Sequence, residues 1–91
     1  MIDFILGETK YVKFAVRSRK QEPFSVRSAS WELYHNGLLE CSGDCEIEKK
    51  DTELYLQIML SPEHRSRKYQ LCITYQTGEE TRKHTENMEV R

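Results

Sequence analysis

Apolar residues recur at every second position in several segments of this chain. The two clearest rows are formed by Leu54, Leu56, Ile58 and Leu60 and by Tyr69, Leu71, Ile73 and Tyr75. Strict alternation is typical of a β-strand with one face in a core and the other face in water. The pattern therefore predicts a small antiparallel β domain.

Turn signals divide the chain into seven expected strands. They cover residues 2–6, 10–17, 24–35, 38–41, 53–60, 69–76 and 81–90, with a weak continuation of the fourth at 45–48. Asn36-Gly37 is the strongest hairpin signal, because both residues tolerate the positive φ of a type I′ turn. Thr77-Gly78-Glu79 predicts a second hairpin turn. Charge content alone would also allow a helix over 46–60, but the apolar spacing of two and Pro62 favour a strand.

The length of 91 residues predicts one domain that covers residues 1–91. Hydrophobic residues make up 37% of the chain and charged residues 32%, which is typical of a soluble domain with a thin core between two sheets. We expect most of the buried surface to come from Phe14, Trp31, Leu33, Leu54, Leu56, Ile58, Leu71, Ile73 and Val90.

Charge and cysteine content narrow the expected partners and compartment. A net charge of −1 argues against nucleic acid, and no apolar run is long enough to suggest a membrane span or a secretory signal. The odd number of cysteines, Cys41, Cys45 and Cys72, predicts free thiols in a reducing compartment. A Cys41–Cys45 bridge across the turn at 42–44 is the alternative. We expect the chain to be cytoplasmic as synthesised.

Several features resemble the immunoglobulin-like β-sandwich. Trp31 lies in the third expected strand, where that fold often has a large core aromatic residue. Tyr69 follows a polar loop, as does the tyrosine of that fold whose hydroxyl caps nearby backbone. Leu71 stands where antibody domains have their second cysteine. The resemblance covers residues 8–91 and implies an all-β, immunoglobulin-like antiparallel sandwich of about seven strands without a disulfide.

A narrower resemblance follows from the order of the segments. Ser28-Ala29-Ser30-Trp31-Glu32-Leu33 leads into the Asn-Gly turn, and a Leu-x-Leu-x-Ile-x-Leu strand is followed by Tyr-x-Leu-x-Ile-x-Tyr and Thr-Gly-Glu. This order resembles small immunoglobulin-like modules of phage and prophage virion proteins, such as those of tails and baseplates. The resemblance implies a structural or assembly protein that is incorporated into a virion.

No arrangement of residues predicts catalysis or a cofactor. Cys41-x-x-x-Cys45 near His35 lacks a second ligand pair, since His64 and His84 are isolated in the sequence, so we expect no metal site. A cysteine nucleophile needs a partner base and a lowered pKa, whereas Cys72 is out of phase with Leu71 and Ile73 and is expected to face away from their side of the strand. The acidic residues Glu46, Glu48, Asp51 and Glu53 are better explained as a charged edge that prevents strand pairing. The protein is therefore not expected to be an enzyme.

Two basic clusters are the candidate interaction sites. The first consists of Arg17, Arg19 and Lys20, and the second of Arg65, Arg67 and Lys68. An immunoglobulin-like path would place them at opposite ends, with Glu79 and Glu80 near the first. The expected function is a non-enzymatic structural or interaction module that binds another protein, or itself, through a sheet edge or a loop end.

Two alternatives remain open at this point. Tyr34 and Tyr55 are out of phase with the core rows, and exposed rings of this kind would suit a module that binds carbohydrate or another small ligand. The apolar strand expected at residues 2–6 has no guarding charge beyond Asp3. It is expected either to pair with its own sheet or to donate to a neighbouring chain.

Overall fold

A computed structural model describes residues 2–17, 26–50, 53–77 and 80–91. These residues form eight strands and no helix. The strands are β1 (Ile2–Phe4), β2 (Lys10–Arg17), β3 (Val26–His35), β4 (Leu38–Asp44), β5 (Glu46–Lys50), β6 (Glu53–Leu60), β7 (Ser66–Thr77) and β8 (Glu80–Val90). Within the described part of the chain, there is thus no helix that could span a membrane.

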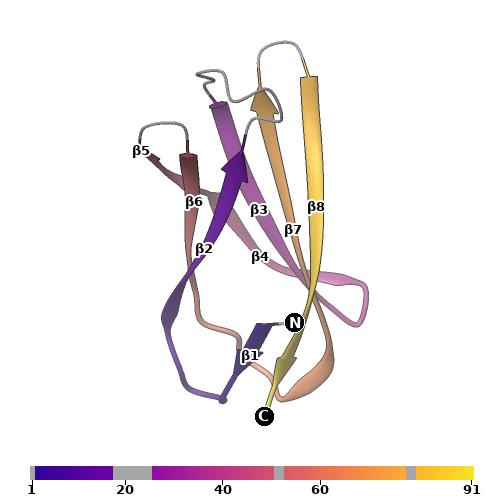
Figure 1. Cartoon of the computed structure of the whole chain (residues 1–91). Helices are drawn as coiled ribbons and strands as arrows, with labels where there is room; N and C mark the ends of the chain where they lie inside the picture. Colours follow the sequence, from indigo (N-terminus) through magenta and orange to yellow (C-terminus); the bar gives the residue numbers. More distant parts are fainter. Residues whose placement is uncertain (1, 18–25, 51–52, 78–79) are drawn as a thin grey trace.

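The strands form two sheets that face each other (Figure 1). One sheet has five strands in the order β1-β8-β7-β3-β4, and the other has three in the order β2-β6-β5. Neighbouring strands are antiparallel except β1 and β8, which are parallel. The prediction of an all-β protein with two sheets is confirmed.

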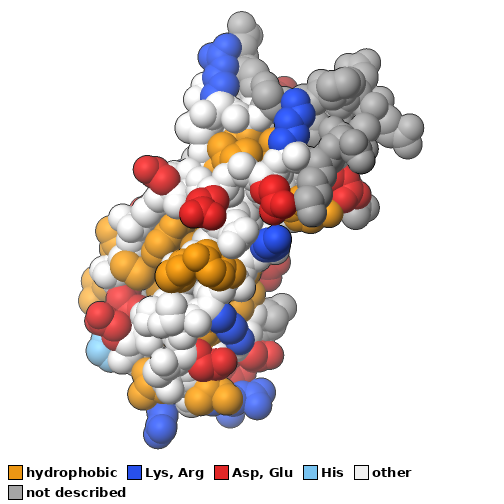
Figure 2. All heavy atoms as spheres, turned by 90° about the vertical axis from the view of Figure 1, so that its left-hand side faces the viewer, with side chains coloured by type: hydrophobic (Ala, Val, Ile, Leu, Met, Phe, Trp, Pro, Cys, Tyr) orange, Lys and Arg blue, Asp and Glu red, His pale blue; other side chains and the backbone are white. Residues whose placement is uncertain are grey.

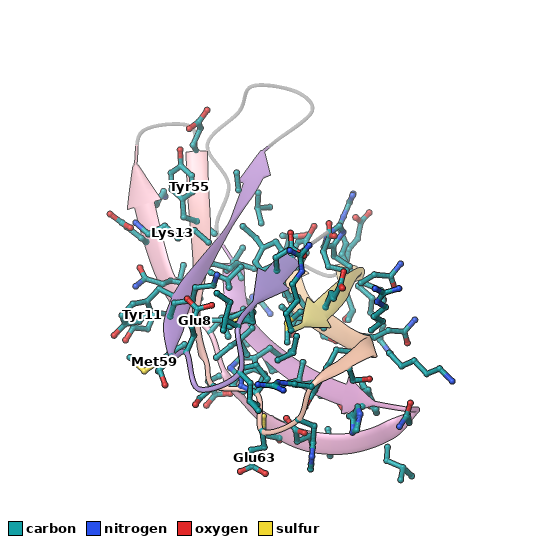
Figure 3. All side chains as sticks on the ribbon, turned by 90° about the horizontal axis from the view of Figure 1, so that it is seen from below. Glu8, Tyr11, Lys13, Tyr55, Met59 and Glu63 are labelled. Carbon is teal, nitrogen blue, oxygen red and sulfur yellow. The ribbon has the colours of Figure 1, made fainter. Side chains whose placement is uncertain are left out.

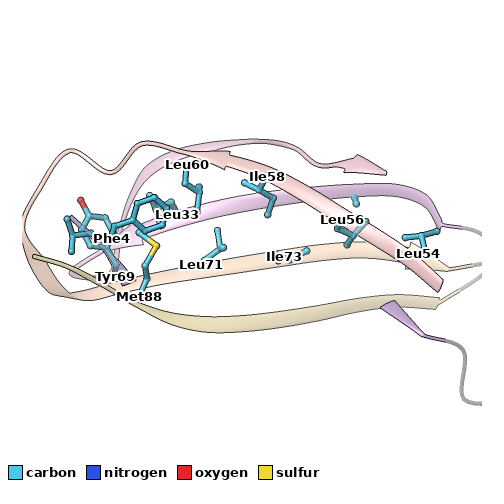
Figure 4. Close-up of a cluster of buried hydrophobic side chains, with 12 residues drawn as sticks. Phe4, Leu33, Leu54, Leu56, Ile58, Leu60, Tyr69, Leu71, Ile73 and Met88 are labelled. Atoms are coloured by element: carbon cyan, nitrogen blue, oxygen red, sulfur yellow. The ribbon is translucent and has the colours of Figure 1, made fainter. Parts of the chain in front are cut away.

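A single core fills the space between the sheets (Figure 4). Its buried apolar residues are Phe4, Ala29, Leu33, Leu54, Leu56, Ile58, Leu60, Tyr69, Leu71, Ile73, Met88 and Val90. The rows predicted from the alternation are therefore buried along β6 and most of β7. Phe14 and Trp31, expected in the core, are only partly buried against it. Phe4, from β1, lies fully inside it instead.

The eighth strand arises because residues 38–50 divide between the two sheets. β4 pairs with β3, whereas β5 pairs with β6. Between them, the backbone N–H of Cys45 still donates to the carbonyl of Ala29 at 2.9 Å. Residues 45–48 were expected to continue the fourth strand, but residues 46–48 belong to β5 of the opposite sheet. The helical alternative for residues 46–60 is wrong.

Strand β1 pairs within its own chain. Ile2, Asp3 and Phe4 lie opposite Met88, Glu89 and Val90 of β8. Beyond the strand, Leu6 N donates to Arg91 O and Arg91 N donates to Phe4 O, both at 2.9 Å. Of the two arrangements expected for residues 2–6, the structure contains the intramolecular one, although the strand is shorter than predicted.

The described residues test the predictions for the turn at Asn36-Gly37 and for the cysteines, but not the whole of the second predicted turn. Asn36 and Gly37 have φ values of 53° and 78°, which confirms the predicted turn with two left-handed residues. The turn predicted at 77–79 includes residues outside the described part of the chain. All three cysteines are free, so no Cys41–Cys45 bridge is formed.

Candidate functional site

Most of the polar residues that are candidates for a functional site lie at one end of the sandwich. It consists of residues 35–40, around the β3–β4 turn, and residues 61–68, which lead from β6 into β7. We call it the hairpin end. The two segments are joined by a backbone hydrogen bond of 3.0 Å from Asn36 N to Lys68 O. Figure 1 shows this β3–β4 hairpin and the segment after β6 at the lower part of the molecule.

A β-bulge in β4 turns Glu40 toward this end of the core. Leu33 lies opposite Cys41, but Tyr34 lies opposite Leu39, so Glu40 is the extra residue. A bulge breaks the strict alternation of side chains and redirects the residue at that point. The Glu40 side chain is only 9% exposed, although it belongs to an edge strand next to an exposed turn.

Glu40 meets three rings from other segments. Tyr69 donates its hydroxyl hydrogen to Oε1 of Glu40 at 2.7 Å and accepts a hydrogen bond from the backbone N–H of His64 at 3.1 Å. The His35 ring stacks on Tyr69 at 4.7 Å and on His64 at 4.9 Å between ring centroids. Nε2 of His35 also lies 3.4 Å from Nδ2 of Asn36. The expected capping of backbone by Tyr69 is thus confirmed.

The surroundings of Tyr69 favour the protonated form of its hydroxyl, which is the form that donates a hydrogen bond. Burial and then the hydrogen bond to Glu40 raise the pKa of Tyr69 to about 12. Its hydroxyl therefore stays protonated to a higher pH than an ordinary tyrosine hydroxyl does. The second carboxylate oxygen of Glu40, Oε2, is buried and has no hydrogen-bond partner among the described residues. Nε2 of His64 lies 3.7 Å from Oε1 of the same carboxylate.

Among the residues that the structure describes, those that could hold a metal ion are His35, Glu40 and His64. Their ligand atoms all lie within 4.8 Å of one another. His64 is isolated only in the sequence, because the fold brings the segment after β6 against the end of β3. His84, by contrast, lies on β8, where its ring contacts Phe14 and its Nε2 lies 3.0 Å from Glu86.

The second basic cluster lies at the hairpin end. Arg65, Arg67 and Lys68 are all exposed, and Arg67 is 3.3 Å from Glu89. Arg67 and Lys68 line an open groove of about 720 Å³ together with Asn36, Gly37, Gln70 and Asn87. The predicted cluster thus borders a recess on the outer side of the five-stranded sheet.

Only Arg17 of the first basic cluster belongs to the residues that the structure describes. Arg17 ends β2 opposite Glu53, whereas Lys10 at the start of β2 lies opposite Leu60. The backbone of Arg17 is therefore at the far end of the three-stranded sheet from Leu60, after which the second cluster follows. Arg19, Lys20 and Glu79 lie outside the described residues.

Exposed apolar side chains accompany the cations at the hairpin end. Leu38 is 74% exposed and Leu39 is 55% exposed, and both belong to the edge strand β4. Leu39 begins a row across the outer face of the sheet, in which the next residues are Tyr34, Gln70 and Asn87. The hairpin end therefore presents both apolar and basic groups.

The outer face of the three-stranded sheet carries hydrophobic, acidic and basic side chains side by side. Figure 2 shows hydrophobic side chains gathered midway along this side of the molecule, between acidic and basic ones. Tyr11 and Met59 are paired across β2 and β6 and about half exposed. Nearby, Nζ of Lys13 lies 3.4 Å from Glu48. Figure 3 shows Tyr11, Met59 and Lys13 on the same side of the fold.

Tyr34 and Tyr55 do not form one aromatic platform. Tyr34 belongs to β3 of the five-stranded sheet and Tyr55 to β6 of the three-stranded sheet. Each hydroxyl donates to the glutamate two residues earlier, Glu32 at 2.7 Å and Glu53 at 2.6 Å. The two rings are therefore separate features, and neither cooperates with the other in binding one ligand.

Comparison with known proteins finds no relative. No protein-family model, no curated protein and no solved structure matches the chain. Glu40 is the residue of the site that sequence reasoning missed. The sequence does contain a sign of its unusual position. A two-residue turn pairs Leu38 with His35, and an unbroken register would then place Glu40, not Cys41, opposite the core residue Leu33.

Proposed function

We propose that this chain is a non-enzymatic protein-interaction module that binds its partner at the hairpin end. The observation that carries the proposal is the exposure of Leu38 and Leu39 on an edge strand. Large apolar side chains grouped at a surface favour contact with another protein. Arg65, Arg67 and Lys68 supply a charged rim to the same end.

The edge strand β4 suits one mode of recognition in particular. Within its sheet, β4 pairs on one side only, with β3. A sheet edge presents unpaired backbone groups, and an extended segment of another protein can add to it as a further strand. The partner segment would place apolar side chains against Leu38 and Leu39 and acidic ones near the three cations.

We further propose that the fold is an immunoglobulin-like sandwich. Supporting features are the parallel pairing of the first strand with the last and the order of the remaining strands in the two sheets. The position of Trp31 on β3 and the hydrogen bond that Tyr69 accepts from His64 N at the β6–β7 connection also support it.

Incorporation into a phage or prophage virion, or into its assembly pathway, is the biological setting that we propose. The support is the order of segments in the sequence, and a small interaction module without enzymatic activity is suited to that setting. The expected observation is that peptides of this chain occur in purified virions. Their absence from virions, with the protein present in the producing cells, would leave an assembly role only.

The interaction is tested by capture with paired variants. The tagged protein is compared with the double variant Leu38→Ser/Leu39→Ser and with the charge reversal Arg65→Glu/Arg67→Glu/Lys68→Glu. Bound proteins are identified by mass spectrometry, and the mass of the free protein in solution is measured in parallel. We expect a protein that binds the natural chain and is lost with both variants, with the charge reversal acting mainly at low salt.

The matched control is Ile47→Ser, which alters a side chain of 42% exposure on β5 of the three-stranded sheet, opposite Leu56 and away from the hairpin end. It should retain the bound protein. If the Leu38→Ser/Leu39→Ser variant retains every bound protein, the hairpin end is not the interface. If the natural chain self-associates and this variant is monomeric, the partner is a second copy.

A further inference from the structure

We propose that the hairpin end binds one divalent transition-metal ion of the Zn²⁺ type through His35, Glu40 and His64. Their ligand atoms lie within 4.8 Å of one another. Zn²⁺ binds imidazole nitrogen and carboxylate oxygen at about 2.0–2.2 Å, so two ligands of one ion are roughly 3–4 Å apart. The rings of His35 and His64 are stacked at 4.9 Å between centroids, so binding of a common ion requires one ring to turn out of the stack, and the His64 side chain, which is 56% exposed, has room to do so.

The buried carboxylate of Glu40 is the second observation. Among the described residues, its Oε2 is the single buried side-chain oxygen or nitrogen without a hydrogen-bond partner. A buried carboxylate oxygen without a partner is unfavourable, because it has lost its hydration without compensation. A cation held between Glu40 and the two imidazoles would supply that compensation.

Tyr69 acts as a positioning residue for this ligand set. Its hydroxyl donates to Oε1 of Glu40 at 2.7 Å, which fixes the carboxylate, and the same oxygen lies 3.7 Å from Nε2 of His64. The hydroxyl is itself held by the backbone N–H of His64. Outer partners of this kind orient metal ligands and increase the affinity for the ion.

The donor set determines the class of ion. Two imidazoles with one carboxylate favour Zn²⁺ and its transition-metal neighbours, whereas Mg²⁺ and Ca²⁺ favour oxygen ligands alone. Three protein ligands leave a fourth position for water. The ion would join the end of β3, the bulge of β4 and the segment after β6. This inference is independent of the proposed interaction.

Metal binding is measured first on the natural chain after treatment with a chelator. Titration calorimetry with Zn²⁺ should give saturable binding of one ion per chain, and the melting temperature should rise with Zn²⁺ concentration. An excess of Mg²⁺ should not compete. Absence of saturable binding, or equal competition by Mg²⁺, would overturn the proposal.

Variants then assign the ligands. We expect His64→Gln and Glu40→Gln each to weaken Zn²⁺ binding by more than about 100-fold, and Tyr69→Phe to weaken it by about 10–100-fold. The matched control is His84→Gln, an exposed histidine beside an acidic residue on β8, which should bind as the natural chain does. Equal weakening by His84→Gln and His64→Gln would contradict the assignment. If the buried Glu40 variant does not fold, the exposed His64 variant decides the test.

Cobalt spectroscopy separates this site from the thiols. Co²⁺ bound to nitrogen and oxygen ligands shows weak visible bands, whereas a cysteine ligand adds an intense sulfur-to-metal charge-transfer band. We expect the visible bands alone, and we expect them to disappear in His64→Gln. An intense charge-transfer band would place the ion on a cysteine and would refute the proposed ligand set.

Discussion

Gly43 is the residue on which the position of Trp31 depends. A Cβ atom at Gly43 would lie 3.1 Å from Nε1 and 3.2 Å from Cε2 of the Trp31 ring. The Trp31 ring therefore lies close over Gly43, and a Cβ atom there would require the ring to shift. The cost of glycine in a strand is offset by this contact.

We expect Gly43→Ala to destabilise the protein by about 1–3 kcal/mol, because the added methyl group forces the ring to move. Trp31 is the only tryptophan, so its fluorescence reports the shift directly. Ser42→Ala, at the exposed neighbouring position, is the control and should leave both the emission spectrum and the melting temperature nearly unchanged. An unaltered spectrum in Gly43→Ala would show that the ring is not held by this contact.

Cys45 is the thiol with the clearest expected change in reactivity. Burial, and then the charge of Asp44, raise the pKa of Cys45 from 9.0 to about 11. Only the thiolate reacts with iodoacetamide. At pH 9, the Cys45 thiol of the folded protein should therefore react roughly 50-fold more slowly than in the unfolded chain, counting the thiolate fraction alone.

The same shift gives a pH dependence of stability. The folded state holds the Cys45 proton more tightly than the unfolded state does. Stability from this group is therefore present below pH 9 and is lost as the pH rises toward about 11. Mass spectrometry of alkylated peptides at several pH values measures the reactivity. A rate equal to that of the unfolded protein would contradict the raised pKa.

Strand β1 contributes one fully buried side chain to the core. Phe4 is 1% exposed, and it lies between the sheets with Tyr69 and Met88 nearby in Figure 4. We expect Phe4→Ala to lower the free energy of unfolding by about 3–5 kcal/mol. Ile5→Ala, one residue later and largely exposed, should change it by less than about 0.5 kcal/mol. Equal effects in urea denaturation would mean that β1 is not docked in solution.

The strands that could be predicted from the sequence are those with one face against the core and the other face in solvent. Leu54 to Leu60 alternate cleanly, since β6 is the central strand of its sheet and every second side chain enters the core. β5 was not predicted as a separate strand, because Ile47 is its single apolar residue and even that side chain is 42% exposed. An edge strand with so little burial leaves a weak pattern.

The site was harder to predict than the strands. His35 and Tyr69 lie opposite each other in the β3–β7 register, and this pairing of strands that are distant in the sequence was not predicted from the alternation of apolar residues. His64 comes from a segment without regular structure, and no periodicity indicates where such a segment packs. Glu40 required the bulge, a departure from the alternation by which the other strands were predicted.

At the scale of the whole molecule, both sheets pack on the same hydrophobic core. Leu56 is buried in β6, and its neighbours across the three-stranded sheet are Phe14 and Ile47. We expect Leu56→Ala to cost about 2–5 kcal/mol through lost burial and the cavity left behind. Since a domain of this size has about 5–10 kcal/mol in total, its melting temperature should fall markedly.

Met59→Ala is the control for that change, because Met59 lies on the same strand but is half exposed. A single cooperative transition should be seen for both variants, by circular dichroism and by the fluorescence of Trp31 alike. If the two probes gave separate transitions in Leu56→Ala, the sheets would not share one core.

The parallel pairing of β1 with β8 has a consequence for the order of folding. Among the eight described strands, β1 is synthesised first, and its partner β8 is synthesised after the other seven. Contacts between segments so distant in the chain close late, because the loop entropy must be overcome before they form. The transition state should therefore contain the β3–β7 and β2–β6 pairs without β1. Phe4→Ala would then accelerate unfolding and leave the refolding rate nearly unchanged.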